Sequence, residues 1–209
     1  MSSPARRPSS WALAAGALAL ALMVWGWTAR QDRLELERRA GAVAGQIAGR
    51  DVRVRCPGVL RRTFAGFSVT SGHVEFSAEG TPGDEAWLEK GPCAALRRLL
   101  DGDAAADLAC VARAGLCDAR ADELARAVDV LAHESQHLAG ILAEDVAECR
   151  ALQAMAQVAV ALGADPAAAQ ALAALQHRTS YHLMPARYQH QECRPGGALD
   201  LTPRDGRWP

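Results

Sequence analysis

Seventeen consecutive residues near the N-terminus, from Trp11 to Trp27, carry no charged side chain. As a helix, this stretch is about 26 Å long, close to the hydrocarbon thickness of a lipid bilayer. Tryptophans lie at both of its ends, where indole rings prefer the headgroup region. We therefore predict a cytoplasmic tip and a transmembrane anchor within residues 1–29. A cleaved signal peptide is the alternative, although the bulky Trp25 and Trp27 make a poor cleavage site.

Arginines flank this stretch on both sides, so charge alone does not set its orientation. Six cysteines decide the matter, because an even number spread through the chain without a CxxC pair favours disulfides in an oxidising compartment. They are Cys56, Cys93, Cys110, Cys117, Cys149 and Cys193. We predict a single-pass protein of the cell membrane whose C-terminal domain is extracytoplasmic.

The length of 209 residues, half of them apolar, suits one folded domain with an N-terminal appendage. We divide the chain into the anchor (1–29), a juxtamembrane helix (30–50) and one extracytoplasmic domain (51–209). The net charge of −1 and the lack of a basic run give no sign of nucleic-acid binding.

Two segments have the period of a β-strand. Residues 51–55 alternate polar residues with valine, and residues 63–77 read as a hairpin that turns at Ser71-Gly72. A loop follows at 78–84. Helical patterns come next: they predict helices over 85–100 with a break at Gly91-Pro92, over 118–163, and over 166–177. The tail from Ser180 is predicted to be an ordered loop held by Cys193.

The motif that carries chemistry is His133-Glu134-Ser135-Gln136-His137, an HExxH sequence. Two histidines four residues apart share one helix face, so that their imidazoles can converge on one metal ion. Glu134 can then reach a water molecule beside that ion and act as a general base. A solvated helix face is the alternative interpretation.

A catalytic zinc site usually has three protein ligands, so a third one is expected nearby. Glu144 and Glu148 follow the motif, but a straight helix would carry Glu144 about 10 Å past His137. Gly140 resolves this, because it can adopt a positive φ and turn the chain sharply. A second helix that begins at Glu144 would then bring its carboxylate back to the metal.

With these residues the chain resembles the zincin metallopeptidases over residues 122–157. The metzincin branch reads HExxHxxGxxH, with its glycine in the place of Gly140, but its third-ligand position here is Ala143, which cannot bind zinc. The gluzincin branch uses a glutamate, often in an ExxAD or ExxAE segment, which residues 144–148 match. The resemblance implies Glu144 as the third zinc ligand and Glu148 as an acid that orients a histidine, or as the alternative ligand.

The tail offers further candidates. Tyr188 and His190 are nominated to stabilise the oxyanion of a tetrahedral intermediate, against the alternative of ordinary surface polar residues. A Cys149–Cys193 bridge would fold the tail over the site. Cys149 as a fourth metal ligand is the alternative, and would make the site structural and closed.

Together these features predict an α+β fold that is mostly helical, and the resemblance implies a zincin-like domain with a small antiparallel sheet from 51–77 beside the HExxH helix. The predicted function is that of a membrane-anchored extracytoplasmic zinc metallopeptidase, whose outer strand aligns a peptide or protein substrate. The N-terminal helix would contact membrane lipid. The alternative is a membrane-anchored binding or structural module without catalysis, with a degenerate or structural zinc site.

Overall fold

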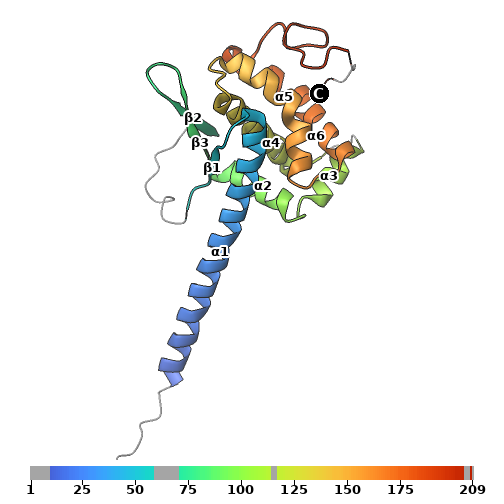
Figure 1. The fold of residues 1–209 in the computed structure, drawn as a ribbon. Coiled ribbons are helices and arrows are strands. Elements are labelled where there is room, and N and C mark those ends of the chain that lie inside the picture. The colour runs from blue at the N-terminus through green and yellow to red at the C-terminus, as the bar shows by residue number, and fades with distance from the viewer. Residues whose placement is uncertain (1–9, 59–70, 114–116, 205–207, 209) are drawn as a thin grey trace, which may run out of the picture. The chain divides into compact units, whose positions relative to one another are not determined.

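The computed structural model describes residues 10–58, 71–113, 117–204 and 208 (Figure 1). The chain divides into two compact units, Met1–Glu35 and Leu36–Pro209. One continuous helix, α1 (Ser10–Ala48), covers both of the segments for which separate helices are predicted. The compact second unit begins at Leu36, within the segment assigned to a juxtamembrane helix.

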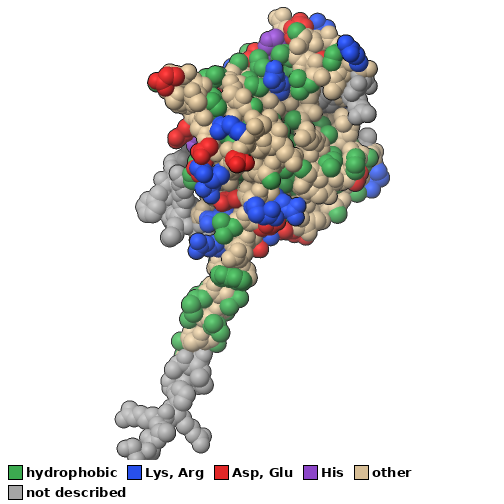
Figure 2. All heavy atoms as spheres, viewed as in Figure 1, with side chains coloured by type: hydrophobic (Ala, Val, Ile, Leu, Met, Phe, Trp, Pro, Cys, Tyr) green, Lys and Arg blue, Asp and Glu red, His purple; other side chains and the backbone are tan. Residues whose placement is uncertain are grey.

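The first unit consists, in its described part, of the N-terminal portion of α1. Its large apolar side chains are exposed: Trp11, Leu18, Leu20, Leu22, Met23, Val24, Trp25, Trp27 and Leu34. Figure 2 shows hydrophobic side chains along this part of the helix. Over the residues that the structure describes, no helix combines the length and the apolar character needed to cross a bilayer, so the predicted transmembrane helix is not supported.

The remainder of α1 belongs to the second unit, and the spacing of its apolar residues accounts for its burial. Leu36, Ala40, Val43 and Ala44 recur at helical spacing and are all buried in the hydrophobic core. Past the end of this helix, the guanidinium of Arg50 donates to the carbonyl oxygens of Leu138 at 3.1 Å and of Gly83 at 2.5 Å. Arg50 thereby ties the sheet to the C-terminal end of the helix that carries the HExxH motif.

The sheet has three strands in the order β1-β3-β2 among the described residues: β1 (Arg53–Arg55), β2 (Gly72–Phe76) and β3 (Pro82–Leu88). β2 pairs with β3 in antiparallel fashion, but β1 pairs with β3 in parallel. The predicted antiparallel sheet is therefore corrected to a mixed one. β1 and β2 lie on opposite sides of β3, and only β2, the strand directly before β3 in the chain, runs antiparallel to it.

Two predictions for this region are wrong in detail. The turn does not lie at Ser71-Gly72 but over residues 77–81, where Gly80 has a φ of +79° and its N–H donates to the Ser77 carbonyl oxygen. The segment 82–88 is a strand, not a loop that leads into a helix. Ala86 and Leu88 are buried on alternate positions, and strands pair with β3 on both sides. The predicted residues 63–70 lie outside the described part.

Helices form the rest of the second unit. They are α2 (Lys90–Leu100), α3 (Ala105–Ala112), α4 (Ala119–Leu138), α5 (Glu144–Ala161) and α6 (Pro166–Thr179), followed by the short 3-10 turns η2 (Tyr181–Leu183) and η3 (Ala186–Tyr188). Gly91 and Pro92 lie in the first turn of α2 and do not break it, because a proline there removes no helical hydrogen bond. The fold is α+β and mostly helical, as predicted.

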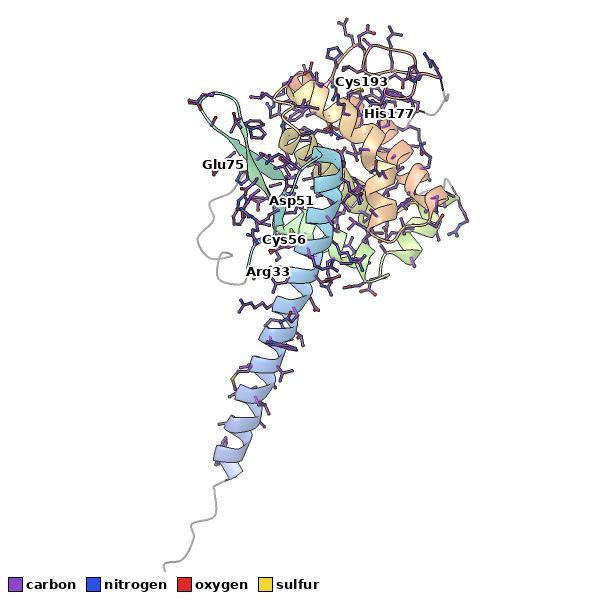
Figure 3. The ribbon with its side chains drawn as sticks, in the orientation of Figure 1. Arg33, Asp51, Cys56, Glu75, His177 and Cys193 are labelled. Carbon is purple, nitrogen blue, oxygen red and sulfur yellow. A yellow bond between two sulfur atoms is a disulfide. The ribbon has the colours of Figure 1, made fainter. Side chains whose placement is uncertain are left out.

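All six cysteines are paired, as predicted for an oxidising compartment. The bridges are Cys56–Cys93, Cys110–Cys117 and Cys149–Cys193. The third one confirms the predicted link between α5 and the tail; Cys193 is labelled in Figure 3. Gln153, one turn further along α5, adds hydrogen bonds to the backbone of Leu199 and Leu201. The tail is therefore held against α5 by a covalent bond and by hydrogen bonds.

Candidate metal centre

Helix α4 carries the HExxH motif through the middle of the second unit. Asp118 caps its N-terminus, with its carboxylate accepting a hydrogen bond from the Arg120 backbone N–H at 3.0 Å. Leu124, Val128 and Leu131 are fully buried and anchor the apolar face. The helix contacts β2 and β3 as well as α2, α5 and α6. A motif in this position is a packed element and not a solvated helix face.

The end of α4 is fixed by a Schellman motif at Gly140. Gly140 has a φ of +93°. Its N–H donates to the His137 carbonyl oxygen at 2.9 Å, and the N–H of Ile141 reaches back to the Gln136 carbonyl oxygen at 3.1 Å. The chain then reverses, and α5 begins at Glu144. This is the sharp turn expected of the glycine.

The reversal brings three side chains together that could hold a metal ion. One ligand atom each from His133, His137 and Glu144 lies within 4.8 Å of the others. The Oε2 atom of Glu144 is 3.0 Å from Nε2 of His133 and 3.3 Å from Nε2 of His137. Both histidines are buried, whereas the Glu144 side chain is 40% exposed. The group is thus rigid on the α4 side and open to solvent at the glutamate.

The other ring nitrogens of the two histidines are already engaged. Nδ1 of His133 donates to Oε2 of Glu148 at 2.9 Å, and Nδ1 of His137 donates to the Ile141 carbonyl oxygen at 2.6 Å. When each ring is neutral, these bonds hold its proton on Nδ1, so that Nε2 offers a lone pair. Metal-binding histidines are held in the same way by carboxylates and backbone carbonyls. The residues present therefore fit a metal ion bound through the two Nε2 atoms and Glu144.

The charges of His133 and Glu144 depend on each other. Burial opposes a charge on His133, but its hydrogen bonds with Glu144 and Glu148 outweigh burial and raise its pKa to about 10. The hydrogen bond with His133 lowers the pKa of Glu144 from its ordinary value. In the absence of a metal, a proton thus holds the place between the two residues that a cation would take.

Glu134 lies beside this group and is almost fully buried. Burial is the main reason that its pKa rises to about 7. Its Oε2 atom has no hydrogen-bond partner among the described residues. A carboxylate with an unpaired buried oxygen is destabilised in the charged form, so it is ready to accept a proton near neutral pH.

Behind Glu148, a second buried acid extends the network. Asp129 lies one helical turn before His133 and accepts a hydrogen bond from Nε2 of the buried Gln176 at 2.8 Å. Burial, and then the charge of Glu148, raise its pKa well above the ordinary value. Sequence reasoning missed both Asp129 and Gln176. The spacing of four residues between Asp129 and His133 was the available signal, since it places both on one helix face.

The two tail candidates differ in position. The ring of Tyr188, in η3, lies 5.8 Å from that of His133. His190 instead has its Nε2 atom 3.9 Å from the carboxylate of Asp145, while its Nδ1 accepts from the Glu192 N–H. None of the contacts described for His190 joins it to His133, His137 or Glu144, the three residues that could hold a metal ion and that we call the metal group. The structure thus places Tyr188 beside the group and His190 at the side of α5.

Strand β2 covers the motif from the other side. The Phe76 ring packs edge-on against that of His137, with centroids 5.8 Å apart. At the opposite end of the strand, Gly72 lies against Glu134. Sequence reasoning treated Gly72 as a turn residue and gave Phe76 no role, because nothing in the local pattern indicates which strand meets α4.

Compared with models of known protein families, with curated proteins and with solved structures, the chain matches none of them. Its function is therefore inferred from its own residues and their arrangement.

Proposed function

We propose that this protein is a zinc-dependent metallopeptidase that resembles the zincins. The observation that carries the proposal is the convergence of His133, His137 and Glu144 within 4.8 Å, with the second nitrogen of each histidine held by a hydrogen bond. Two imidazoles and one carboxylate form a donor set that suits zinc. Glu148, paired with His133, would serve as the acid that orients this ligand.

Catalytic rather than structural zinc is supported by the number of ligands. Structural sites are closed by four protein ligands, whereas catalytic sites have three and keep one position open. The group contains three residues among those described, and Cys149 is bonded to Cys193 and so is not a fourth ligand. The buried position of Glu134 also argues against the alternative of a binding module, in which this side chain would face solvent.

When bound, zinc supplies a Lewis acid that polarises a carbonyl group and makes water acidic near neutral pH. Glu134 is the general base: its carboxylate accepts the proton of the attacking water and then passes it to the leaving amine. In the metal-free chain, burial raises the pKa of Glu134 to about 7, close to neutral pH. Tyr188, beside His133, is the residue whose hydroxyl would donate to the developing oxyanion.

An extended peptide or protein segment is the substrate that the sheet favours. Ser71 and Glu89 form a hydrogen-bonded pair, so Gly72 and Val74 occupy the alternate positions, whose N–H and C=O groups point away from β3. β2 is an outer strand of the described sheet. Its backbone could therefore align a substrate strand beside Glu134. The three disulfides support an extracytoplasmic location, and attachment to the cell membrane stays a prediction.

The test is metal content and peptide hydrolysis of the purified full chain. Wild type should bind one equivalent of zinc, and Glu144→Ala should lose it. Glu75→Ala, at an exposed position of β2 (Figure 3), is the matched control and should retain it. Glu134→Gln should keep the metal but lower kcat by at least about 100-fold. A wild-type protein that binds no zinc would refute the proposal, and loss of zinc only in Glu148→Ala would move the third ligand.

A further inference from the structure

Gly72 lies on β2 at a position where an added side chain and the Glu134 carboxylate would overlap. A Cβ atom built on Gly72 would lie 2.7 Å from Oε1, 2.9 Å from Cγ and 3.1 Å from Cδ of Glu134. Carbon atoms in contact prefer about 3.5–4.0 Å. All three nearest atoms belong to the same glutamate. The Cβ atom of any larger residue at position 72 would therefore clash with Glu134 first.

The rest of the strand shows that this is a specific fit. Phe76, on the same strand, packs against His137, one helical turn beyond Glu134 on α4. β2 thus lies across the motif, with a large side chain opposite the second histidine and none opposite the glutamate. Backbone geometry gives no separate reason for a glycine, because Gly72 is not among the glycines with positive φ.

We propose that Gly72 is a positioning residue, whose missing side chain leaves the volume in which the Glu134 carboxylate lies between β2 and α4. This inference rests on the proposed function of Glu134 as the general base. Because a carboxylate is the mobile end of its side chain, an alanine at position 72 would rotate Glu134 away and leave the fold and the metal ligands in place. A catalytic base displaced by about 1 Å loses about 100-fold in rate.

The first experiment compares Gly72→Ala with wild type as full chains. We expect an unchanged zinc content, a kcat lowered by about 100-fold and a KM within about twofold, because substrate binding does not use the carboxylate. Gly83→Ala is the matched control: it lies on β3, and its added Cβ would meet the Glu75 carbonyl oxygen at 3.3 Å instead of Glu134. Gly72→Ala with the wild-type kcat, or equal losses in both variants, would overturn the inference.

A thermal-unfolding cycle tests the contact without any assay of activity. Gly72→Ala is introduced into wild type and into Glu134→Ala, where the overlapping atoms are gone. We expect the loss in Tm caused by Gly72→Ala to be larger in wild type than in the Glu134→Ala background. Equal losses would show that the two residues do not interact. The cycle can therefore succeed or fail even if the chain hydrolyses no peptide, which separates this inference from the proposed function.

Discussion

At the scale of single residues, His133 is the most constrained group, since carboxylates engage both of its ring nitrogens. Its pKa of about 10 means that the apo protein carries a proton on His133 at neutral pH. Zinc requires the neutral ring, so binding must release that proton. We expect about one proton released per zinc at pH 7, and an apparent affinity that rises about tenfold per pH unit between about pH 6 and 8.

Calorimetric titration in buffers of different ionisation enthalpy measures this release directly. His190→Ala is the control, because the contacts of His190 lie with Asp145 and Glu192 and leave the metal group unchanged. Zinc binding without proton release at pH 7 would show that His133 is neutral in the apo protein.

Asp129, an acid where His133 is a base, makes the stability of the folded chain depend on pH. Burial raises its pKa in the folded chain well above the 3.8 that it has when unfolded. A raised folded pKa means that the contribution of this group to stability is present below about pH 4 and is lost as pH rises. Asparagine resembles the protonated acid and does not titrate. In the apo protein, we therefore expect Asp129→Asn to lose less stability than wild type as pH rises above about 4, by up to about 1.4 kcal/mol per pH unit.

Urea unfolding at several pH values, with a chelator present, measures this difference. Asp118→Asn is the matched control, because Asp118 is an exposed N-cap and asparagine caps helices equally well. Parallel stability curves for wild type and Asp129→Asn would show that Asp129 is ionised in the folded chain.

The sequence predicted the residues of the metal group for a physical reason. His133, His137 and Glu144 lie close along the chain, so helix geometry and one glycine turn suffice to bring them together. Gln176 and Gly72 come from other elements, 39 residues after His137 and 62 before Glu134 by their numbers. Their approach depends on how α6 and β2 pack on α4, and no local pattern carries that information.

At the scale of elements, the turn between α4 and α5 depends on Gly140. A Cβ on Gly140 would meet nothing within 4 Å, so its φ of +93° is the sole reason that alanine is disfavoured there. We expect Gly140→Ala to lower the free energy of unfolding by about 1–2 kcal/mol and to weaken zinc binding, because the strain is relieved by moving Glu144.

Gly26→Ala is a matched control for this prediction. Gly26 lies within α1, also with open space around it but without a positive φ. Alanine there should be neutral or stabilising by up to about 1 kcal/mol. Chemical unfolding and zinc titration of both variants measure the difference, and an equal response of the two would remove the role assigned to the turn.

The elements also show where local patterns mislead. Residues 85–88 contain Glu, Ala and Leu, which favour helices, and four residues are too few to reveal a period of two. Strand pairing on both sides of β3 outweighs that preference. In α4 and α5, by contrast, helix propensity, the apolar face and the glycine turn all favour the same structure, which is why those boundaries were predicted closely.

At the scale of the whole molecule, the Cys149–Cys193 bridge joins the tail with Tyr188 to the helix that carries Glu144 and Glu148. It closes a loop over a sequence separation of 44, whereas Cys110–Cys117 closes one of 7. Loop-closure entropy predicts losses of about 4 kcal/mol and about 2 kcal/mol when the respective bridges are replaced by serines. The larger effect should come with a functional one, since η3 contacts α5 and places Tyr188 beside His133.

For Cys149→Ser/Cys193→Ser, we therefore expect a retained zinc content, because His133, His137 and Glu144 do not belong to the tail. We expect kcat to fall by about 10-fold or more, because the oxyanion donor loses its position. Cys110→Ser/Cys117→Ser should lose stability but keep kcat. Tyr188→Phe separates the two effects: it keeps the bridge and the stability, and should reproduce the loss in kcat. If Tyr188→Phe is fully active while the Cys149→Ser/Cys193→Ser variant is not, the tail acts by shielding the site from water and Tyr188 is not the donor.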